Sequence, residues 1–290
     1  MGKPMTDDIS LAEHFKDWVG RRYQRDDVID RRLVEHFSAM LAPHFSKIPP
    51  VPPGLFWCLS PDVLPSEDLG GDGHPRMGLL MPALPLPRRM WAGGELVFHR
   101  DFSLDARVTK TSTIENIYFK KGRSGDLAFV TVRHHYHEAQ HLVLDERQDI
   151  VYRDPPSETA MPETQIADNK QSPEPGPTVW RIVPDPVLLF RYSALTMNGH
   201  RIHYDHPYAT GIEGYKGVVV HGPLQATLML NLATNLLGKL PEKFTYRGLA
   251  PLTLGAHLTV SGTVGAGDNI STSVISSTGI ETMTGIATDN

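Results

Sequence analysis

The sequence is short of three things, and each shortage argues against a class of protein. Its 290 residues include one cysteine, Cys58, which rules out an intrachain disulfide and a metal cluster held by thiolates. No apolar run approaches the roughly 20 residues that a membrane-crossing helix needs, so no membrane partner is expected. Lysine and arginine number 28 against 33 aspartates and glutamates, whereas a nucleic-acid partner usually requires a basic face. The N-terminal residues also lack a secretory-signal pattern, and we expect a cytoplasmic location.

Proline and glycine, in contrast, are plentiful, with 24 and 25 residues. Six of the prolines gather between residues 154 and 177, among glutamate, serine, threonine and glutamine. Such a segment holds little regular structure and has little apolar surface to bury. We interpret 154–177 as a linker between an N-terminal domain, 1–153, and a C-terminal domain, 178–290.

The first domain is predicted to begin with helices and to continue with strands. A helix over 11–19 should end at Gly20, and Asp26–Asp27 should cap a second helix whose apolar residues recur at helical spacing from Val28 to Leu41. Strand-rich runs follow at 96–98, 106–114, 117–121 and 127–136, with a hairpin turn at 121–126.

The second domain repeats this layout. After a strand at 179–183, Asp185 and Pro186 form a helix start. A second helix opens at His221-Gly222-Pro223 and ends at Gly238, and because it has no clearly polar face it should be buried. Strands are predicted at 244–249, 252–261, 270–275 and 282–288. The composition and pattern indicate an α+β protein of two similar halves.

Two features of the segment 190–225 can carry chemistry. Asn198 and His203 flank a turn at Gly199, so both side chains can converge on one small volume. Histidine can take a proton from water near neutral pH and return it, and the Asn198 amide can hold that water. The first amides of the helix that starts at Gly222 lack internal partners and favour negative charge, which suits a thioester oxygen that gains charge. Gly222 would also let an acyl group approach the backbone.

At these residues the sequence resembles a known family. The runs YSALTMNGHRIHYD (192–205) and VVHGPLQATL (219–228) are similar to the motif of MaoC-type hydratases in the hotdog superfamily. The runs PLPRRMWAGGELVF (85–98), KKGRSGDLAFV (120–130) and ERQDIVYRD (146–154) resemble the N-terminal domain of a double-hotdog branch. That branch contains fungal-type mitochondrial hydroxyacyl-thioester dehydratase, mesaconyl-C4-CoA hydratase and itaconyl-CoA hydratase.

The resemblance implies a double hotdog, with a degenerate first domain that helps to form an acyl tunnel and a catalytic second domain. It implies a hydro-lyase that adds water to a short carboxylated enoyl-CoA, or removes it, and that needs no cofactor. Asn198 stands where the wider family has aspartate. His203 is therefore expected to act as the acid/base, with Asn198 holding the water, Gly222 holding the thioester oxygen, and Asp205 as a possible orienting partner.

Four further residues are candidates for substrate binding: Arg201, His221, Arg88 and Arg89. Arginine suits phosphates or a substrate carboxylate, although a solvated turn is the simpler account of Arg88 and Arg89. His221 could shape the oxyanion site or cap the helix. Histidines at 200, 203 and 206 also suggest a metal site, but without an acidic cluster we predict none. The histidines of 133–141 are interpreted as an exposed strand face.

Three alternatives remain open at this point: a 3-hydroxyacyl-thioester dehydratase of fatty-acid synthesis, a non-catalytic acyl-CoA-binding subunit, and a thioesterase. The last lacks a candidate carboxylate at the helix. The protein is expected to be a monomer or a homodimer, because two hotdog domains in one chain already pair their sheets internally.

Overall fold

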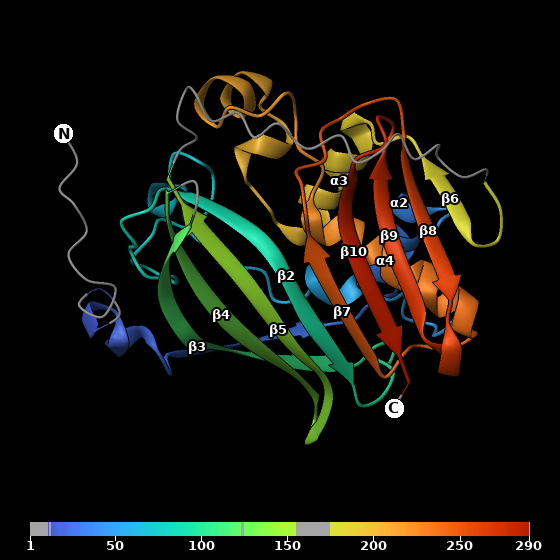
Figure 1. The fold of residues 1–290 in the computed structure, drawn as a ribbon. Coiled ribbons are helices and arrows are strands. Elements are labelled where there is room, and N and C mark those ends of the chain that lie inside the picture. The colour runs from blue at the N-terminus through green and yellow to red at the C-terminus, as the bar shows by residue number, and fades with distance from the viewer. Residues whose placement is uncertain (1–10, 12, 123–124, 155–174, 290) are drawn as a thin grey trace.

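One antiparallel sheet of ten strands runs through both halves of the chain in the computed structural model, which describes residues 11, 13–122, 125–154 and 175–289 (Figure 1). Most of the predicted linker and part of the 121–126 turn lie outside these residues. The strands are β1 (Arg22–Val28), β2 (Arg88–Phe98), β3 (Arg107–Gly122), β4 (Gly125–Glu138), β5 (His141–Arg153), β6 (Val179–Ile182), β7 (Lys243–Gly248), β8 (Leu258–Val264), β9 (Ile270–Ser276) and β10 (Glu281–Thr288).

The strand order shows the internal repeat directly. It reads β1-β3-β4-β5-β2 and then β7-β10-β9-β8-β6, so each half runs first, third, fourth, fifth, second from its outer edge to the middle. Figure 1 shows the strands of the two halves side by side, green to the left and orange to red to the right. The halves join where β2 pairs with β7, with Gly94 opposite Tyr246 and Leu96 opposite Phe244.

Glycine is required at this join. A Cβ on Gly94 would lie 2.2 Å from the carbonyl oxygen of Arg147 and 2.4 Å from the Tyr246 hydroxyl. Any side chain there would collide with backbone, so the Gly93-Gly94 pair lets β5, β2 and β7 approach one another.

The helix α4 (Gly222–Leu237) is buried against the second half of the sheet, as its apolar sequence predicts. It contacts β8, β9 and β10, and it ends at Gly238, whose φ of 72° is the left-handed conformation that glycine adopts readily. The helix α3 (Pro186–Thr196) begins where expected, because the Asp185 side chain accepts a hydrogen bond from the Leu188 N–H.

The first helix of the N-terminal half differs from the prediction. Residues 22–28 form β1, and α2 (Arg31–Leu41) is capped by Asp30, which accepts from the Leu33 N–H. Asp26 is held by Arg107 and Thr109 across the sheet, so its carboxylate is used between strands. The helix α2 buries only one face, and that face joins the same apolar core as α4.

Three smaller boundaries also differ. The helix predicted over 11–19 is shorter than expected, because residues Lys16–Trp18 form a 3₁₀ turn and Val19 has an extended backbone. The strands predicted at 106–114 and 117–121 are one strand, β3, with a register shift between Ile114 and Asn116. The strand predicted to start at Leu252 begins at Leu258, because the preceding residues form a loop that bridges to Val219. Among the described residues, no helix is long and apolar enough to cross a membrane.

A buried amide on α4 ties the long loop after α2 to the core. The Ser46 N–H donates to Oδ1 of Asn231 (2.8 Å), and Nδ2 of Asn231 donates to the carbonyls of Pro53 (2.7 Å) and Thr227 (2.8 Å). Asn231 is fully buried. Its side chain therefore satisfies backbone groups that water cannot reach.

We predict that Asn231→Ala lowers the free energy of unfolding by at least about 2 kcal/mol, since each buried group left unpaired costs about 1 to 3 kcal/mol. Urea unfolding measures the loss. Asn235→Ala, at an exposed position of the same helix, is the matched control and should change stability by less than about 0.5 kcal/mol. Equal effects of the two substitutions would contradict the assignment.

Candidate active site

A short loop after α3 places the predicted base. Met197 takes the left-handed conformation with φ of 50° and ends the helix, and Oδ1 of Asn198 accepts a hydrogen bond from the His200 N–H at 3.0 Å. A 3₁₀ turn, Arg201–His203, then turns the chain inward. We call residues 197–205 the catalytic loop. Asn198 uses its oxygen within the loop, and its amide N–H groups are the part that can serve a water molecule.

His203 is buried and held in one tautomer. Its Nδ1 lies 2.8 Å from the carbonyl oxygen of Val219. Because a carbonyl can only accept, the proton sits on Nδ1, and Nε2 carries a lone pair. Burial lowers the pKa of His203 to about 4. The ring is therefore a neutral base at physiological pH.

His221 lies directly against this base, at the start of α4. The rings of His203 and His221 stack with centroids 3.6 Å apart, and Nε2 of His221 lies 2.8 Å from the Ser193 hydroxyl. Burial, followed by the neighbouring His203 and His200, lowers the pKa of His221 well below its usual value. The His221 side chain does not cap the helix, so of the two predicted roles the capping role is wrong.

Gly222, the first residue of α4, contacts the first half of the chain. A Cβ at this position would lie 2.8 Å from Cε3 of Trp91 on β2. The glycine thus lets an indole from the N-terminal half cover the start of the buried helix. The sequence analysis predicted that the acyl group would approach the backbone at Gly222. In the structure, the side chain of Trp91 packs against this glycine.

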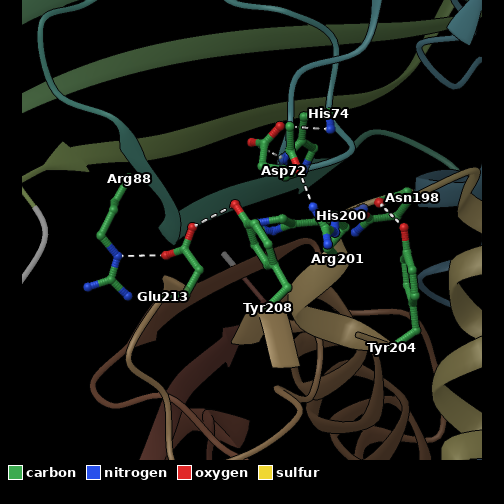
Figure 2. Close-up of polar contacts among 11 residues, drawn as sticks. Asp72, His74, Arg88, Asn198, His200, Arg201, Tyr204, Tyr208 and Glu213 are labelled. Carbon is green, nitrogen blue, oxygen red and sulfur yellow. Dashed lines mark hydrogen bonds and ion pairs between the residues drawn. The ribbon is translucent and has the colours of Figure 1, made fainter. Parts of the chain in front are cut away.

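The first half also contributes two polar residues that the sequence prediction missed. Asp72 lies 3.1 Å from Nδ1 of His74, and the ring of His74 lies over that of His200 with centroids 4.2 Å apart (Figure 2). His200 in turn is 5.6 Å from His203, ring to ring. Burial, together with the charge of Arg89, lowers the pKa of His74 to about 4. Nothing in the local sequence signals this contact, since the segments are far apart in the chain.

Of the three histidines whose spacing suggested a metal site, at 200, 203 and 206, only the first two lie close together. His200 and His203 are buried, whereas His206 is exposed. Potential ligand atoms of Asp72, His74 and His200 do lie within 4.8 Å of one another. The His135 and His137 rings lie 6.4 Å apart on one strand, as the alternation predicts.

The four predicted binding residues lie in different settings. Arg88 is buried, and its Nε donates to Glu213 at 2.7 Å (Figure 2), so its charge is already compensated. Arg201 is bonded to Asp205 at 2.7 Å. Asp205 therefore orients Arg201, and its predicted role as partner of His203 is wrong. Arg89, at the start of β2, lies close enough to the histidines for its charge to lower the pKa of His74, after burial, and that of His200, after burial and the neighbouring His74 and His203.

A hollow of about 1000 Å³ spans the middle of the sheet, from β3 and β4 across the join of β2 and β7 to β8. It is lined by residues such as Gly94, Arg147 and Thr245, and none of the predicted site residues borders it. The acyl tunnel between the halves stays a prediction.

Comparison with known proteins identifies the family to which this chain belongs. The model of the hydroxyacyl-thioester dehydratase type 2 family matches residues 55–254, which include the catalytic loop and the start of α4. This chain belongs to that family. The enzyme is 42% identical over 240 residues to mesaconyl-C4-CoA hydratase of Chloroflexus aurantiacus, which covers 81% of this chain and 84% of the relative. It is 26% identical over 268 residues to the mitochondrial hydroxyacyl-thioester dehydratase type 2 of Schizosaccharomyces pombe, covering 81% and 87%.

Solved structures confirm the fold of the enzyme. HtdX of Mycobacterium tuberculosis superposes with a TM-score of 0.64 at 19% identity, over 93% of this chain and all of that chain. A second protein of M. tuberculosis, described as having a double hotdog fold, gives 0.54 at 15% identity over 94% and 96%. The double hotdog predicted from the resemblance is confirmed.

The burial of His203 makes a testable contribution to the pH dependence of stability. Unfolded histidine binds a proton near pH 6.5, whereas folded His203 does so only near pH 4. The unfolded state therefore binds more protons as the pH falls from 6.5 towards 4, and stability falls in that window. At pH 5, which is 1.5 pH units below the pKa of unfolded histidine, protonation of His203 in the unfolded state lowers the free energy of unfolding by about 2 kcal/mol.

In ¹³C-histidine NMR, the chemical shift of the folded His203 ring should stay at the value of a neutral imidazole from pH 7 to pH 5. Once the protein is unfolded in urea, the same ring should titrate near pH 6.5. A midpoint near 6.5 in the folded protein would show that the ring is solvated and would contradict the buried-base assignment.

Proposed function

We propose that this enzyme adds water to the double bond of a short, carboxylated enoyl-CoA, with mesaconyl-C4-CoA as the first substrate to test. The observation that carries the proposal is the single tautomer of His203. Its Nδ1 is tied to Val219, its Nε2 is left as a neutral base, and its ring stacks on His221, the residue immediately before α4.

The proposed reaction uses these parts in order. Nε2 of His203 takes a proton from a water molecule whose oxygen bonds to the β-carbon of the enoyl group. The electron pair of the double bond moves onto the thioester oxygen, where the backbone N–H of Gly222 and the positive end of the α4 dipole stabilise the negative charge. The imidazolium then returns its proton to the α-carbon, so water is added and the base is regenerated. The amide of Asn198 aligns the water.

A neutral base in a dry setting favours this chemistry over simple acyl-CoA binding. A non-catalytic subunit needs neither a fixed tautomer nor a lowered pKa. Burial lowers the pKa of His203 below neutrality, so the ring is unprotonated before each turnover and becomes a strong proton donor after it has accepted one.

We predict that His203→Ala lowers kcat for hydration about 10²- to 10⁴-fold, the usual contribution of general acid–base catalysis. The assay follows loss of the enoyl-thioester absorbance. The control is His206→Ala, an exposed histidine three residues away, which should keep full activity. Turnover of His203→Ala within twofold of the parent would sink the mechanism. Absence of hydration by the parent with every enoyl-CoA tested would sink the function itself.

The carboxylated substrate is supported by the Chloroflexus relative and by an arginine in reach of the site. Of the candidate arginines, Arg88 and Arg201 already pair with Glu213 and Asp205. Arg89 is half-buried beside the histidines, with Asp72 and the Tyr152 hydroxyl as its polar neighbours. We assign it the free carboxylate of the acyl group, and itaconyl-CoA is a second candidate with the same charge.

We predict that Arg89→Met raises KM for mesaconyl-C4-CoA at least tenfold and leaves KM for crotonyl-CoA, which lacks the carboxylate, within twofold. Arg100→Met, at an exposed arginine beyond the far end of β2, is the control and should change neither value. An equal rise with both substrates would point to coenzyme A binding instead and would refute the assignment.

The 3-hydroxyacyl-thioester dehydratase of fatty-acid synthesis is the second candidate, because the matching family model and the relative from Schizosaccharomyces pombe are both described as hydroxyacyl-thioester dehydratase type 2. A panel of C4 to C10 enoyl thioesters separates the two. Preference for long unbranched chains over carboxylated C4 and C5 substrates would favour the dehydratase.

A further inference from the structure

A turn from the first half is docked onto the catalytic loop. This turn, residues 69–76, lies between β1 and β2 in the chain and is closed by a bridge between Leu69 and Pro75. The backbone N–H of Arg201 donates to the carbonyl of Asp72 at 2.8 Å, and the Arg201 guanidinium donates to the carbonyl of Gly71 at 2.9 Å. Two hydrogen bonds thus join the halves beside His203.

Two glycines make the contact as close as backbones allow. A Cβ on Gly73 would lie 2.0 Å from the carbonyl oxygen of Gly199, and a Cβ on Gly199 would lie 2.8 Å from the carbonyl oxygen of Gly73. Gly73 also has a φ of +88°, which side chains rarely adopt. A substitution there must push the turn away from the catalytic loop.

The turn also fixes the ring that touches the loop. Oδ1 of Asp72 accepts from the His74 backbone N–H at 3.0 Å, and Oδ2 lies 3.1 Å from Nδ1 of the same residue. Both carboxylate oxygens therefore hold His74, whose ring lies 4.2 Å from that of His200. On its other side, the backbone of His200 is held by Asn198. His200 is clamped between the two halves, three residues before His203.

We propose that Asp72 and His74 are positioning residues for the hydration reaction: through His200 and the Gly73–Gly199 contact, they hold the catalytic loop where Nε2 of His203 meets the substrate. Asn198, where the wider family has aspartate, brings no negative charge to the catalytic loop. Asp72 brings a carboxylate to the loop from the other half of the chain. The inference rests on the proposed function.

The same three side chains could instead bind a divalent transition metal, since two imidazoles and a carboxylate are suitable ligands. The geometry favours positioning, because both oxygens of Asp72 are already engaged with His74. Metal binding is made an outcome of the test.

The decisive comparison is Gly73→Ala against Gly71→Ala. A Cβ on Gly71 meets nothing within 4 Å, so this neighbouring substitution is the matched control and should keep full activity. Gly73→Ala should lower kcat at least tenfold with KM within threefold, because an ångström of misplacement costs about 10²-fold in rate. Wild-type kcat in Gly73→Ala, or an equal loss in both variants, would overturn the proposal.

A second pair of variants tests the carboxylate with the turn intact. Asp72→Asn keeps an acceptor for the His74 backbone N–H, so it should retain more of kcat than Asp72→Ala. Thermal unfolding shows whether each variant is folded at the assay temperature. If the Asn variant is as inactive as the Ala variant and the purified parent contains one bound metal per chain that chelation removes together with activity, the cluster is a metal site and the positioning role is wrong.

One readout does not depend on turnover. The imidazole resonances of His203 in ¹³C-histidine NMR, recorded without substrate, should move in Gly73→Ala and not in Gly71→Ala. If the parent hydrates no enoyl-CoA but this difference is seen, the proposed function fails and the positioning contact stands. If the parent is active and the resonances do not move, the positioning contact fails alone.

Discussion

The hydrogen bond between His203 and the carbonyl of Val219 is the contact on which the site depends. It is one of a pair, because the Val219 N–H donates to the carbonyl of Ile202 at 2.8 Å. The two bonds fasten the catalytic loop to the strand-like segment that leads into α4. They set the tautomer of the base and, in the same step, its distance from the start of the buried helix. His203 and the start of α4, which come from segments on either side of residues 204–218, are thereby fixed relative to each other.

The parts that could be predicted from the sequence are those written in local spacing. The Asp185 cap of α3, the Gly238 end and the burial of α4, and the position of His203 all depend on residues near one another in the chain. The misplaced cap of α2 shows the limit of such signals. Asp26, Asp27 and Asp30 are all possible helix caps, and only pairing of β1 with β3 decides that the first two belong to a strand. That pairing is not visible in a local window.

The contribution of the first half could not be predicted for a related reason. Arg201 and Gly71 are 130 positions apart, and the aspartate, glycine and histidine of 72–74 look like an ordinary turn. For Trp91, the sequence likewise predicts only a position in a strand, and its contact with the start of α4 becomes visible only in the structure. The resemblance implied a degenerate first domain that helps to enclose the acyl chain. The structure adds that this domain covers the start of α4 and braces the catalytic loop.

The join between β2 and β7 determines how a separated half of this protein would behave. Each half ends at that join in a strand whose outer N–H and C=O groups are satisfied only by the other half. A C-terminal half produced alone would carry His203 and the buried helix, yet β7 would be an unprotected sheet edge, which pairs readily with another chain. Such a fragment would be expected to assemble with a second copy through β7, reproducing the ten-strand sheet. That second copy would bring another catalytic loop in place of the turn that holds the first.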